Sequence, residues 1–222
     1  MGYTKEQLSF CVGACVPDLI GADCKLLFVG INPGLQTAMT GLHFAHPSNR
    51  FWPAMKKAGN VDWVPDVSPT TPAVRVDVFD PPTHVPYPVF RPKGLDHWDV
   101  DISCGMTEAE RQDFIARGMG ITNLVSRASV RASDLTSEEL SLGGTRLVRF
   151  VDEVRPAIVA VAGVTAYRSA FSDPKATMGR QARLFGESAV WVVPNPSGLN
   201  AHETVASLAN WYREVATEAG LK

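Results

Sequence analysis

The sequence predicts an α/β fold: a single domain with a central, mostly parallel sheet and helices on both of its faces. Short apolar segments bounded by Gly or Pro recur along the chain and are typical of interior strands. Amphipathic segments of helical period lie between them, and this alternation is typical of a parallel sheet. The length of 222 residues suits one sizeable domain, residues 1–222, and would be a tight fit for two.

The N-terminal part predicts a helix, a strand and a second, shorter helix. Thr4, followed three residues later by Gln7, forms a capping-box pattern, and we expect a helix over residues 4–20. A buried strand is predicted from Leu26. After a long loop, Arg50–Ala58 is predicted to form a short helix, which the glycine that follows would end.

Residues 60–104 are rich in proline and are predicted to form an irregular insertion within the domain. Val74–Phe79 could form a strand in it, and Tyr87–Pro92 an extended edge. Basic side chains that alternate with an aromatic one could bind a DNA backbone, although a solvated loop anchored by one Trp has the same pattern. These side chains are Arg91, Lys93 and Trp98.

The C-terminal half alternates between helices and strands. Helices are predicted at Thr107–Gly118, Thr136–Val154, Gly163–Phe171 and His202–Ala219, and strands at Gly120–Val125, Ala157–Ala162 and Val190–Val193. The first two helices begin with a Thr-x-x-Glu capping box. The basic stretch Arg180–Arg183, which precedes a hairpin-like pair, is predicted to be a solvated turn.

Composition and charge exclude some classes of protein. A hydrophobic content of 45% and a charged content of 20% are ordinary for a globular protein. The net charge of −2 counts mildly against a nucleic-acid partner, but a local basic patch can exist within a neutral total. No stretch approaches the length of apolar sequence that crosses a membrane, and no secretory signal is evident. We therefore expect a cytoplasmic protein.

The four cysteines do not have the spacing of a metal site. Cys11 and Cys15 are four residues apart, as on one face of a helix, and the other two are Cys24 and Cys104. A Cys-x-x-Cys pair, which zinc and iron–sulfur sites often use, is absent from the sequence. We expect buried, unreactive thiols, no metal and no cofactor.

Two strands end in similar corners. The strand that starts at Leu26 ends at Gly30-Ile31-Asn32-Pro33-Gly34, and Val190–Val193 ends at Pro194-Asn195-Pro196-Ser197-Gly198-Leu199-Asn200. In open α/β sheets, ligands bind outside the carboxyl ends of the strands. Ordinary βα turns with a core Phe at position 44 are the alternative interpretation, because Gly and Pro mark most turns.

These corners carry a family resemblance. GINPG at 30–34, FAHPSNRFW at 44–52, GITNLVSRAS at 120–129 and NPSGL at 195–199 resemble the mismatch-specific uracil-DNA glycosylases, which are related to the thymine-DNA glycosylases. The resemblance covers most of the chain outside roughly residues 60–106. It implies a uracil-DNA glycosylase-like fold and a monomeric, monofunctional DNA repair enzyme. Such an enzyme hydrolyses the N-glycosidic bond of uracil, or of related damaged or mismatched bases, flipped out of double-stranded DNA.

The resemblance also implies roles at the first corner. Asn32 matches the catalytic Asn, which orients a water molecule because an amide is too weak a base to deprotonate one. The ring of Phe44 would stack on the base, and backbone groups of Ile31 and Phe44 would bind its edge. Asn123 would also contact the base, although an Asn that caps a turn is the alternative. His43 and His46 are expected to form hydrogen bonds within the loop.

At the second corner, the resemblance implies a DNA-binding loop. Leu199 would enter the base stack as a wedge, although a hydrophobic staple against the last helix is the alternative. Asn195, Ser197 and Gly198 would bind phosphates. Asn200 could bind the opposite strand, but the Ser-Arg pair common in the family after this Leu is missing, which puts the preference for the opposite base in doubt.

Two functions remain open at this point. The first corner lacks the Asp that faster uracil-specific families carry, so slow turnover and a tolerant pocket are expected. The alternative is a non-catalytic α/β module that binds nucleotides or damaged DNA. Asn32 favours the enzyme, because a module that only binds has no need of it.

Overall fold

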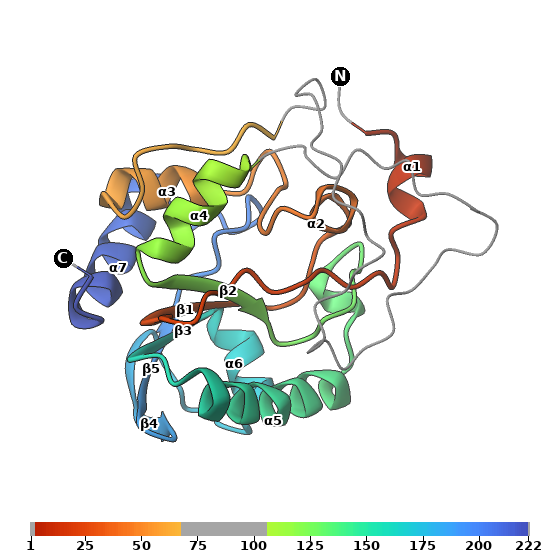
Figure 1. Cartoon of the computed structure of the whole chain (residues 1–222). Helices are drawn as coiled ribbons and strands as arrows, with labels where there is room; N and C mark the ends of the chain where they lie inside the picture. Colours follow the sequence, from red (N-terminus) through yellow and green to blue (C-terminus); the bar gives the residue numbers. More distant parts are fainter. Residues whose placement is uncertain (1–2, 68–105, 222) are drawn as a thin grey trace.

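A five-stranded sheet forms the centre of the protein. The computed structural model describes residues 3–67 and 106–221. The strands lie in the order β2-β1-β3-β5-β4 (Figure 1). The parallel strands are β1 (Leu26–Gly30), β2 (Met119–Asn123), β3 (Ile158–Ala162) and β5 (Ser188–Val193), and the antiparallel edge strand is β4 (Gly179–Phe185). The predicted fold class is confirmed.

Helices cover both faces of this sheet. On one face lie α3 (Phe51–Ala58), α4 (Glu108–Ala116) and α7 (Val205–Glu218), and on the other lie α5 (Ser137–Val154) and α6 (Val164–Phe171) (Figure 1). Two short helices, α1 (Lys5–Ser9) and α2 (Leu35–Thr40), lie beyond the end of the sheet. Each face has its own hydrophobic core, and Phe28 packs into one while Leu27 and Val29 pack into the other.

Burial on both faces explains why the strands are continuously apolar. Every residue of β1, β2, β3 and β5 is buried, as expected for parallel strands between two layers of helices. Two glycines let α5 approach closely. A Cβ at Gly143 would lie 2.3 Å from the carbonyl oxygen of Leu124, and one at Gly144 would lie 2.4 Å from that of Ala170.

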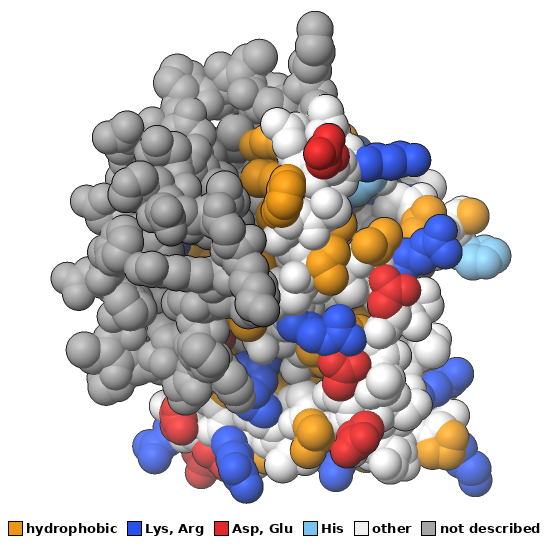
Figure 2. Space-filling model, turned by 90° about the vertical axis from the view of Figure 1, so that its right-hand side faces the viewer, with side chains coloured by type: hydrophobic (Ala, Val, Ile, Leu, Met, Phe, Trp, Pro, Cys, Tyr) orange, Lys and Arg blue, Asp and Glu red, His pale blue; other side chains and the backbone are white. Residues whose placement is uncertain are grey.

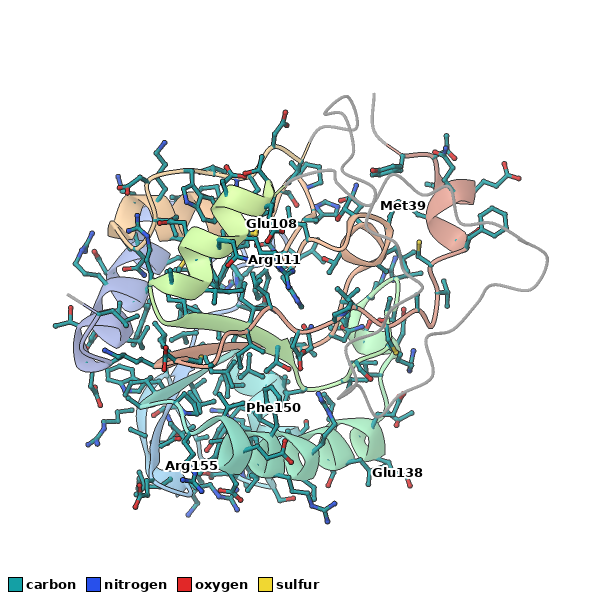
Figure 3. All side chains as sticks on the ribbon, in the orientation of Figure 1. Met39, Glu108, Arg111, Glu138, Phe150 and Arg155 are labelled. Atoms are coloured by element: carbon teal, nitrogen blue, oxygen red, sulfur yellow. The ribbon has the colours of Figure 1, made fainter. Side chains whose placement is uncertain are left out.

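The carboxyl edge of the sheet, where the parallel strands end, is the side that carries the two corners. Strand β1 leads from this edge directly into α2 (Figure 1). The N-terminal end of α5 also lies on this side. Figure 3 shows Glu138 near the carboxyl edge and Arg155 at the opposite end of the same helix.

The predicted helix over residues 4–20 is wrong in length. The capping box of Thr4 and Gln7 is confirmed, but α1 ends at Ser9 and buries none of its side chains. Gly13 has a φ of +83°, which suits a turn, and Pro17 cannot continue a helix. Leu19 instead pairs with Ile121 through hydrogen bonds of 2.9 and 2.7 Å, so this segment covers the edge strand β2. Cys11 and Cys15 therefore do not share a helix face.

Several other boundaries differ from the predictions. Helix α2 was not expected, and Arg180–Arg183 belongs to strand β4 rather than to a turn. Strand β2 starts one residue before the predicted Gly120 and ends at Asn123, two residues before the predicted end. The last helix begins at Val205, because Thr204 caps it with Ser207. The predicted elements between residues 74 and 92, and most of the insertion at 60–104, lie outside the described residues.

Three predicted helices are confirmed closely. The helix expected at Arg50–Ala58 is α3, which ends at Gly59 with a φ of +76°. Those expected from Thr107 and Thr136 are α4 and α5, and both have the predicted capping box. Within residues 3–67 and 106–221, no helix is long and apolar enough to cross a membrane.

Candidate functional site

Three asparagines and one glycine lie at the carboxyl edge of the sheet, each at or just after the end of a parallel strand. Asn32 follows β1, Asn123 ends β2, Gly163 follows β3 and Asn195 follows β5. A Cβ at Gly163 would lie 3.6 Å from both Asn195 Cβ and Ile31 Cδ1, so the ends of three neighbouring strands are in close contact. The two Asn-Pro corners, distant along the chain, therefore lie close together at this edge.

The amide of Asn32 has a defined orientation. Its Nδ2 donates to Ser129 Oγ at 2.8 Å and to the carbonyl oxygen of Arg127 at 3.1 Å, and it lies 3.1 Å from the carbonyl oxygen of Pro33. The Ser129 hydroxyl donates in turn to the Arg131 carbonyl oxygen at 2.6 Å, so its own oxygen is free to accept. Asn32 Oδ1 has no hydrogen-bond partner within the described part of the chain, and it is the acceptor that this side chain presents.

Phe44 lies at the rim of the core, with one face covered. Its ring stacks on Phe51 with a centroid distance of 4.1 Å and an interplanar angle of 20°. Its φ is +59°, an unusual value for an aromatic residue and one that occurs often at functional sites. The tip of the ring reaches Gly30, because a Cβ there would lie 3.5 Å from Phe44 Cζ. The other face of the ring has no aromatic partner among the described residues.

Two backbone donors flank this ring. Within residues 3–67 and 106–221, no hydrogen bond uses the amide N–H of Ile31 or of Phe44. The carbonyl oxygen of Ile31 accepts from Val125 at 2.9 Å, which holds the first corner against the end of β2. Among the described residues, the corner after β1 and the loop that carries Phe44 therefore each have one N–H donor that no hydrogen bond uses.

Asn123 is buried next to the same corner. Its Oδ1 lies 2.5 Å from the position that a Cβ at Gly30 would take, so a side chain at position 30 would displace the Asn123 amide. Its Nδ2 lies 3.5 Å from Nδ1 of His43. Arg146 on α5 donates to the carbonyl oxygens of Asn123 and Leu124. The acceptor oxygen of Asn123, Oδ1, thus points toward the end of β1.

His43 sets this orientation through its tautomer. Its Nε2 lies 3.0 Å from the carbonyl oxygen of Pro17, which can only accept, so Nε2 carries the proton and Nδ1 is an acceptor for Asn123. Complete burial lowers the pKa of His43, and Arg111 lowers it further, against the opposing effects of Asp18 and of the Pro17 carbonyl. Burial also raises the pKa of Asp18, against the effects of Thr122, His43 and Arg146.

The second corner is a stiff loop with an exposed apolar tip. Ser197 N–H donates to Asn195 Oδ1 at 3.0 Å, and Asn200 N–H donates to the Ser197 carbonyl oxygen at 2.9 Å. Asn200 Nδ2 donates to the Asn195 carbonyl oxygen at 3.0 Å, while its Oδ1 accepts from His202 N–H at 3.3 Å. Both polar ends of Asn200 are thus used inside the loop. Leu199 projects from it with 91% of its surface exposed.

The two corners touch through Ser48, Gly198 and Arg50. A Cβ at Gly198 would lie 2.3 Å from Ser48 Oγ and 2.8 Å from its carbonyl oxygen, so only glycine fits there. Arg50 N–H donates to the Pro196 carbonyl oxygen at 3.0 Å, and its guanidinium donates to the Asn200 carbonyl oxygen at 2.7 Å. Asn32, Phe44, Asn123 and Leu199 therefore belong to one connected surface.

A comparison with known protein families identifies the family of the chain. The model of the uracil DNA glycosylase superfamily matches the chain over residues 17–218, which includes every strand and both corners. The chain belongs to the uracil DNA glycosylase superfamily. Members of this superfamily are DNA N-glycosylases, hydrolases that act on uracil-type lesions in base excision repair, and DNA is accordingly the partner of this protein.

Sequence reasoning missed four residues that organise the site of this glycosylase. Arg50 and Ser129 lie within the matching motifs, but a motif does not show which residue holds another. Asp18 and Arg146 come from segments that had no assigned role. Arg146 is half-buried, and its partners are carbonyl oxygens at the end of β2, which only the tertiary structure brings next to it.

The charge distribution at the carboxyl edge of the glycosylase is mixed. Figure 2 looks onto this side of the protein. Among the described residues on this face, Lys and Arg side chains alternate with those of Asp and Glu, and hydrophobic side chains lie between them. This mixture agrees with the net charge of −2. Of the thiols expected to be buried, Cys11 and Cys24 are buried, Cys15 is only half-buried, and Cys104 lies outside the described residues. The described residues contain no cluster of side chains that could hold a metal.

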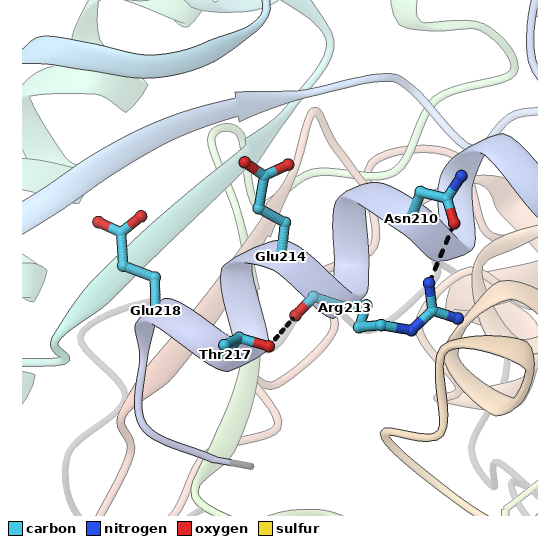
Figure 4. Close-up of a pocket in the computed structure, with 5 residues that line it drawn as sticks. All are labelled: Asn210, Arg213, Glu214, Thr217 and Glu218. Atoms are coloured by element: carbon cyan, nitrogen blue, oxygen red, sulfur yellow. Dashed lines mark hydrogen bonds between the residues drawn. The ribbon is translucent and has the colours of Figure 1, made fainter.

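A shallow groove elsewhere on the glycosylase does not compete with this site. Five residues of α7 line it, and two hydrogen bonds join three of them: Arg213 donates to Asn210 Oδ1 at 3.0 Å, and the Thr217 hydroxyl donates to the Arg213 carbonyl oxygen at 2.8 Å (Figure 4). The C-terminal end of α7 lies at the opposite end of the sheet from α2 (Figure 1). The groove is therefore the exposed side of one helix.

Replacement of His43 by Gln should weaken the dependence of stability on pH. The folded protein keeps His43 neutral, whereas the unfolded chain takes up a proton near the ordinary pKa of 6.5, so the free energy of unfolding falls as the pH drops below that value. The loss is at most about 1.4 kcal/mol for each pH unit. Chemical denaturation of the wild type and the variant between about pH 7.5 and pH 5.5 measures it.

The control for this experiment is His202→Gln, since His202 is an exposed histidine in the loop before α7. Asp18 is present in all three proteins, and its raised pKa acts in the opposite direction; because His43 lowers this pKa, the comparison measures the joint contribution of His43 and Asp18. Equal pH dependence in the wild type and in His43→Gln would contradict the neutral, buried His43.

Proposed function

We propose that this protein is a monofunctional, monomeric glycosylase that removes uracil, and related deaminated or mismatched bases, from double-stranded DNA and leaves an abasic site. The observation that carries the proposal is the orientation of Asn32. Its amide nitrogen is held by the segment 127–129, and its unpartnered Oδ1 lies at the carboxyl edge, on the same corner as Phe44. A module that only binds bases has no use for such an acceptor.

In this proposal, Asn32 orients the attacking water. The water donates one hydrogen bond to Oδ1, and its oxygen attacks C1′ of the deoxyribose as the bond between C1′ and the base nitrogen breaks. The bonding electron pair leaves with the base, and the water loses its proton to solvent. Because an amide is not a general base, the rate depends on positioning and on electrostatics, and slow turnover is expected.

The base would lie on the face of the Phe44 ring opposite Phe51. Base–aromatic stacking contributes roughly 1–3 kcal/mol for each base, which offsets the cost of a few kcal/mol for flipping it out. The unpaired N–H groups of Ile31 and Phe44 would stabilise the charge that grows on the leaving base, as in an oxyanion hole. Asn123 Oδ1 would accept from the imide N–H that uracil and thymine possess and cytosine lacks, which favours the deaminated base.

Leu199 would fill the space that the base leaves. Its exposed side chain stands on a loop whose own hydrogen bonds already define its shape, so insertion into DNA requires little ordering. The N–H of Gly198, which no hydrogen bond among the described residues uses, would bind a phosphate oxygen, whereas the N–H groups of Ser197, Leu199 and Asn200 are used within the loop. Since both polar ends of Asn200 are used within the loop, we expect weak preference for the base opposite the lesion.

Asn32→Ala should abolish most excision while DNA binding survives. We expect the single-turnover rate on a duplex with one uracil to fall roughly a hundredfold or more, because the water loses its orientation. The abasic product is cleaved with alkali and quantified on a gel, and binding is measured by fluorescence anisotropy on the same duplex.

The matched control is Asn210→Ala, because Asn210 is an exposed residue of α7. It should retain the wild-type rate. If Asn32→Ala cleaves as fast as the wild type, Asn32 has no part in the mechanism. A wild-type protein that binds the uracil duplex but does not cleave it would support the non-catalytic module instead.

Leu199→Ala should separate paired from unpaired substrates. Without the wedge we expect excision from duplex DNA to fall about tenfold, while excision from a single strand, which needs no base to be unpaired, changes little. The matched control is Leu142→Ala, because Leu142 is an exposed leucine on α5. Equal losses on both substrates would indicate a packing role for Leu199.

A further inference from the structure

Arg50 is bound by the backbone of the second corner. The residue lies at the end of the loop that carries Phe44, which follows the first corner and α2, and it immediately precedes α3. Its guanidinium donates to the carbonyl oxygens of Ser197 and Glu203 and, at 2.7 Å, to that of Asn200. With its own N–H on Pro196, Arg50 contacts the connection between β5 and α7 at four places, on both sides of Leu199.

Among the residues that the structure describes, Arg50 has no acidic partner in an ion pair. Each ion pair in the described part of the chain involves another arginine, whereas the partners of Arg50 are carbonyl oxygens. A planar guanidinium can donate to several acceptors at fixed angles at once, and an ammonium group is a point donor on a flexible stem. Geometry therefore distinguishes Arg from Lys at this position, while charge does not.

The loop that carries the exposed Leu199 needs contacts with another segment to fix its position. The internal hydrogen bonds of residues 195–200 form a turn, but they do not fix where this turn stands relative to the first corner. Leu199 itself contributes little packing because 91% of its surface is exposed. Contact between the corners comes from the close approach of Gly198 to Ser48 and from the bonds of Arg50.

We propose that Arg50 is a positioning residue, which holds the Leu199 loop at a fixed distance and orientation from the corner that carries Asn32 and Phe44. This rests on the proposed role of Leu199 as a wedge. When Leu199 is held at the correct position relative to Asn32 and Phe44, its side chain enters the DNA at the place from which the base has left. When the hydrogen bonds of the Arg50 guanidinium are lost, the loop can move, and Leu199 is then correctly placed for insertion in only a fraction of encounters with DNA.

Hydrogen exchange tests the hold of Arg50 on the loop without reference to activity. Arg50→Lys keeps the positive charge but removes the planar guanidinium and its several hydrogen bonds. We therefore expect amide exchange in residues 196–203 to accelerate about tenfold or more. Arg213→Lys is the matched control, because Arg213 also donates to a carbonyl oxygen, that of Lys57 at 3.2 Å, but from the outer side of α7. Unchanged exchange in residues 196–203 of Arg50→Lys would overturn the proposal.

A double-mutant cycle tests whether Arg50 acts through Leu199. The measured quantity is the ratio of single-turnover excision rates on duplex and single-stranded uracil DNA. We expect Arg50→Lys to lower this ratio about tenfold, and to lower it no further in a Leu199→Ala background. An equal loss on both substrates, or losses that multiply in the double variant, would overturn the proposal, since a purely structural role predicts either result.

The two readouts separate failure of this proposal from failure of the proposed function. If the wild type cleaves neither substrate, the glycosylase proposal fails, while hydrogen exchange still decides whether Arg50 holds the loop. If the wild type cleaves both substrates and the ratio in Arg50→Lys equals that of the wild type, Arg50 has no positioning role. Thermal unfolding of each variant identifies any that fail to fold, and Arg50→Gln then replaces Arg50→Lys in both experiments.

Discussion

The hydrogen bonds that hold Asn32 Nδ2 are the interaction on which the rest of the site depends. A neutral amide can present either its donor or its acceptor, and the environment of the nitrogen determines which. Here the carbonyl oxygen of Arg127 and the hydroxyl of Ser129 bind the nitrogen. Arg127 is itself bound to Glu139 in the capping box at the start of α5, through a bond of 2.9 Å. The orientation of one amide is thus anchored in the helix layer below the sheet.

The second constraint on the geometry of the site is the close approach of neighbouring groups to two glycines. Gly30 leaves room for Asn123 Oδ1 at the end of β1, and Gly198 leaves room for Ser48 where the two corners meet. A side chain at either position would separate groups that must lie together. The topology brings the corners to one edge, because parallel strands end on the same side, and the glycines then allow contact. The site is therefore built mostly from backbone geometry, and few of its side chains are charged.

Local patterns predicted the parts of this protein that local physics determines. The apolar strands, the capping boxes at Thr107 and Thr136, and the grouping of the two Asn-Pro corners at one edge follow from periodicity and from strand direction. The helix expected over residues 4–20 failed because pairing of Leu19 with Ile121 outweighs helical propensity beyond Ser9. Residues that act at a distance along the chain, such as Arg50 and Arg146, leave no local pattern, because their partners are carbonyl oxygens of other segments.

The most direct test of the account is a crystal structure of the wild-type protein with a duplex that contains 2′-fluoro-arabino-deoxyuridine, whose glycosidic bond resists hydrolysis. The account predicts that the uracil lies against the face of the Phe44 ring opposite Phe51, with Asn123 Oδ1 at its imide N–H. It also predicts a water between Asn32 Oδ1 and C1′, and Leu199 in the vacated space. A uracil that stays in the helix, or that binds away from Asn32, would contradict the account.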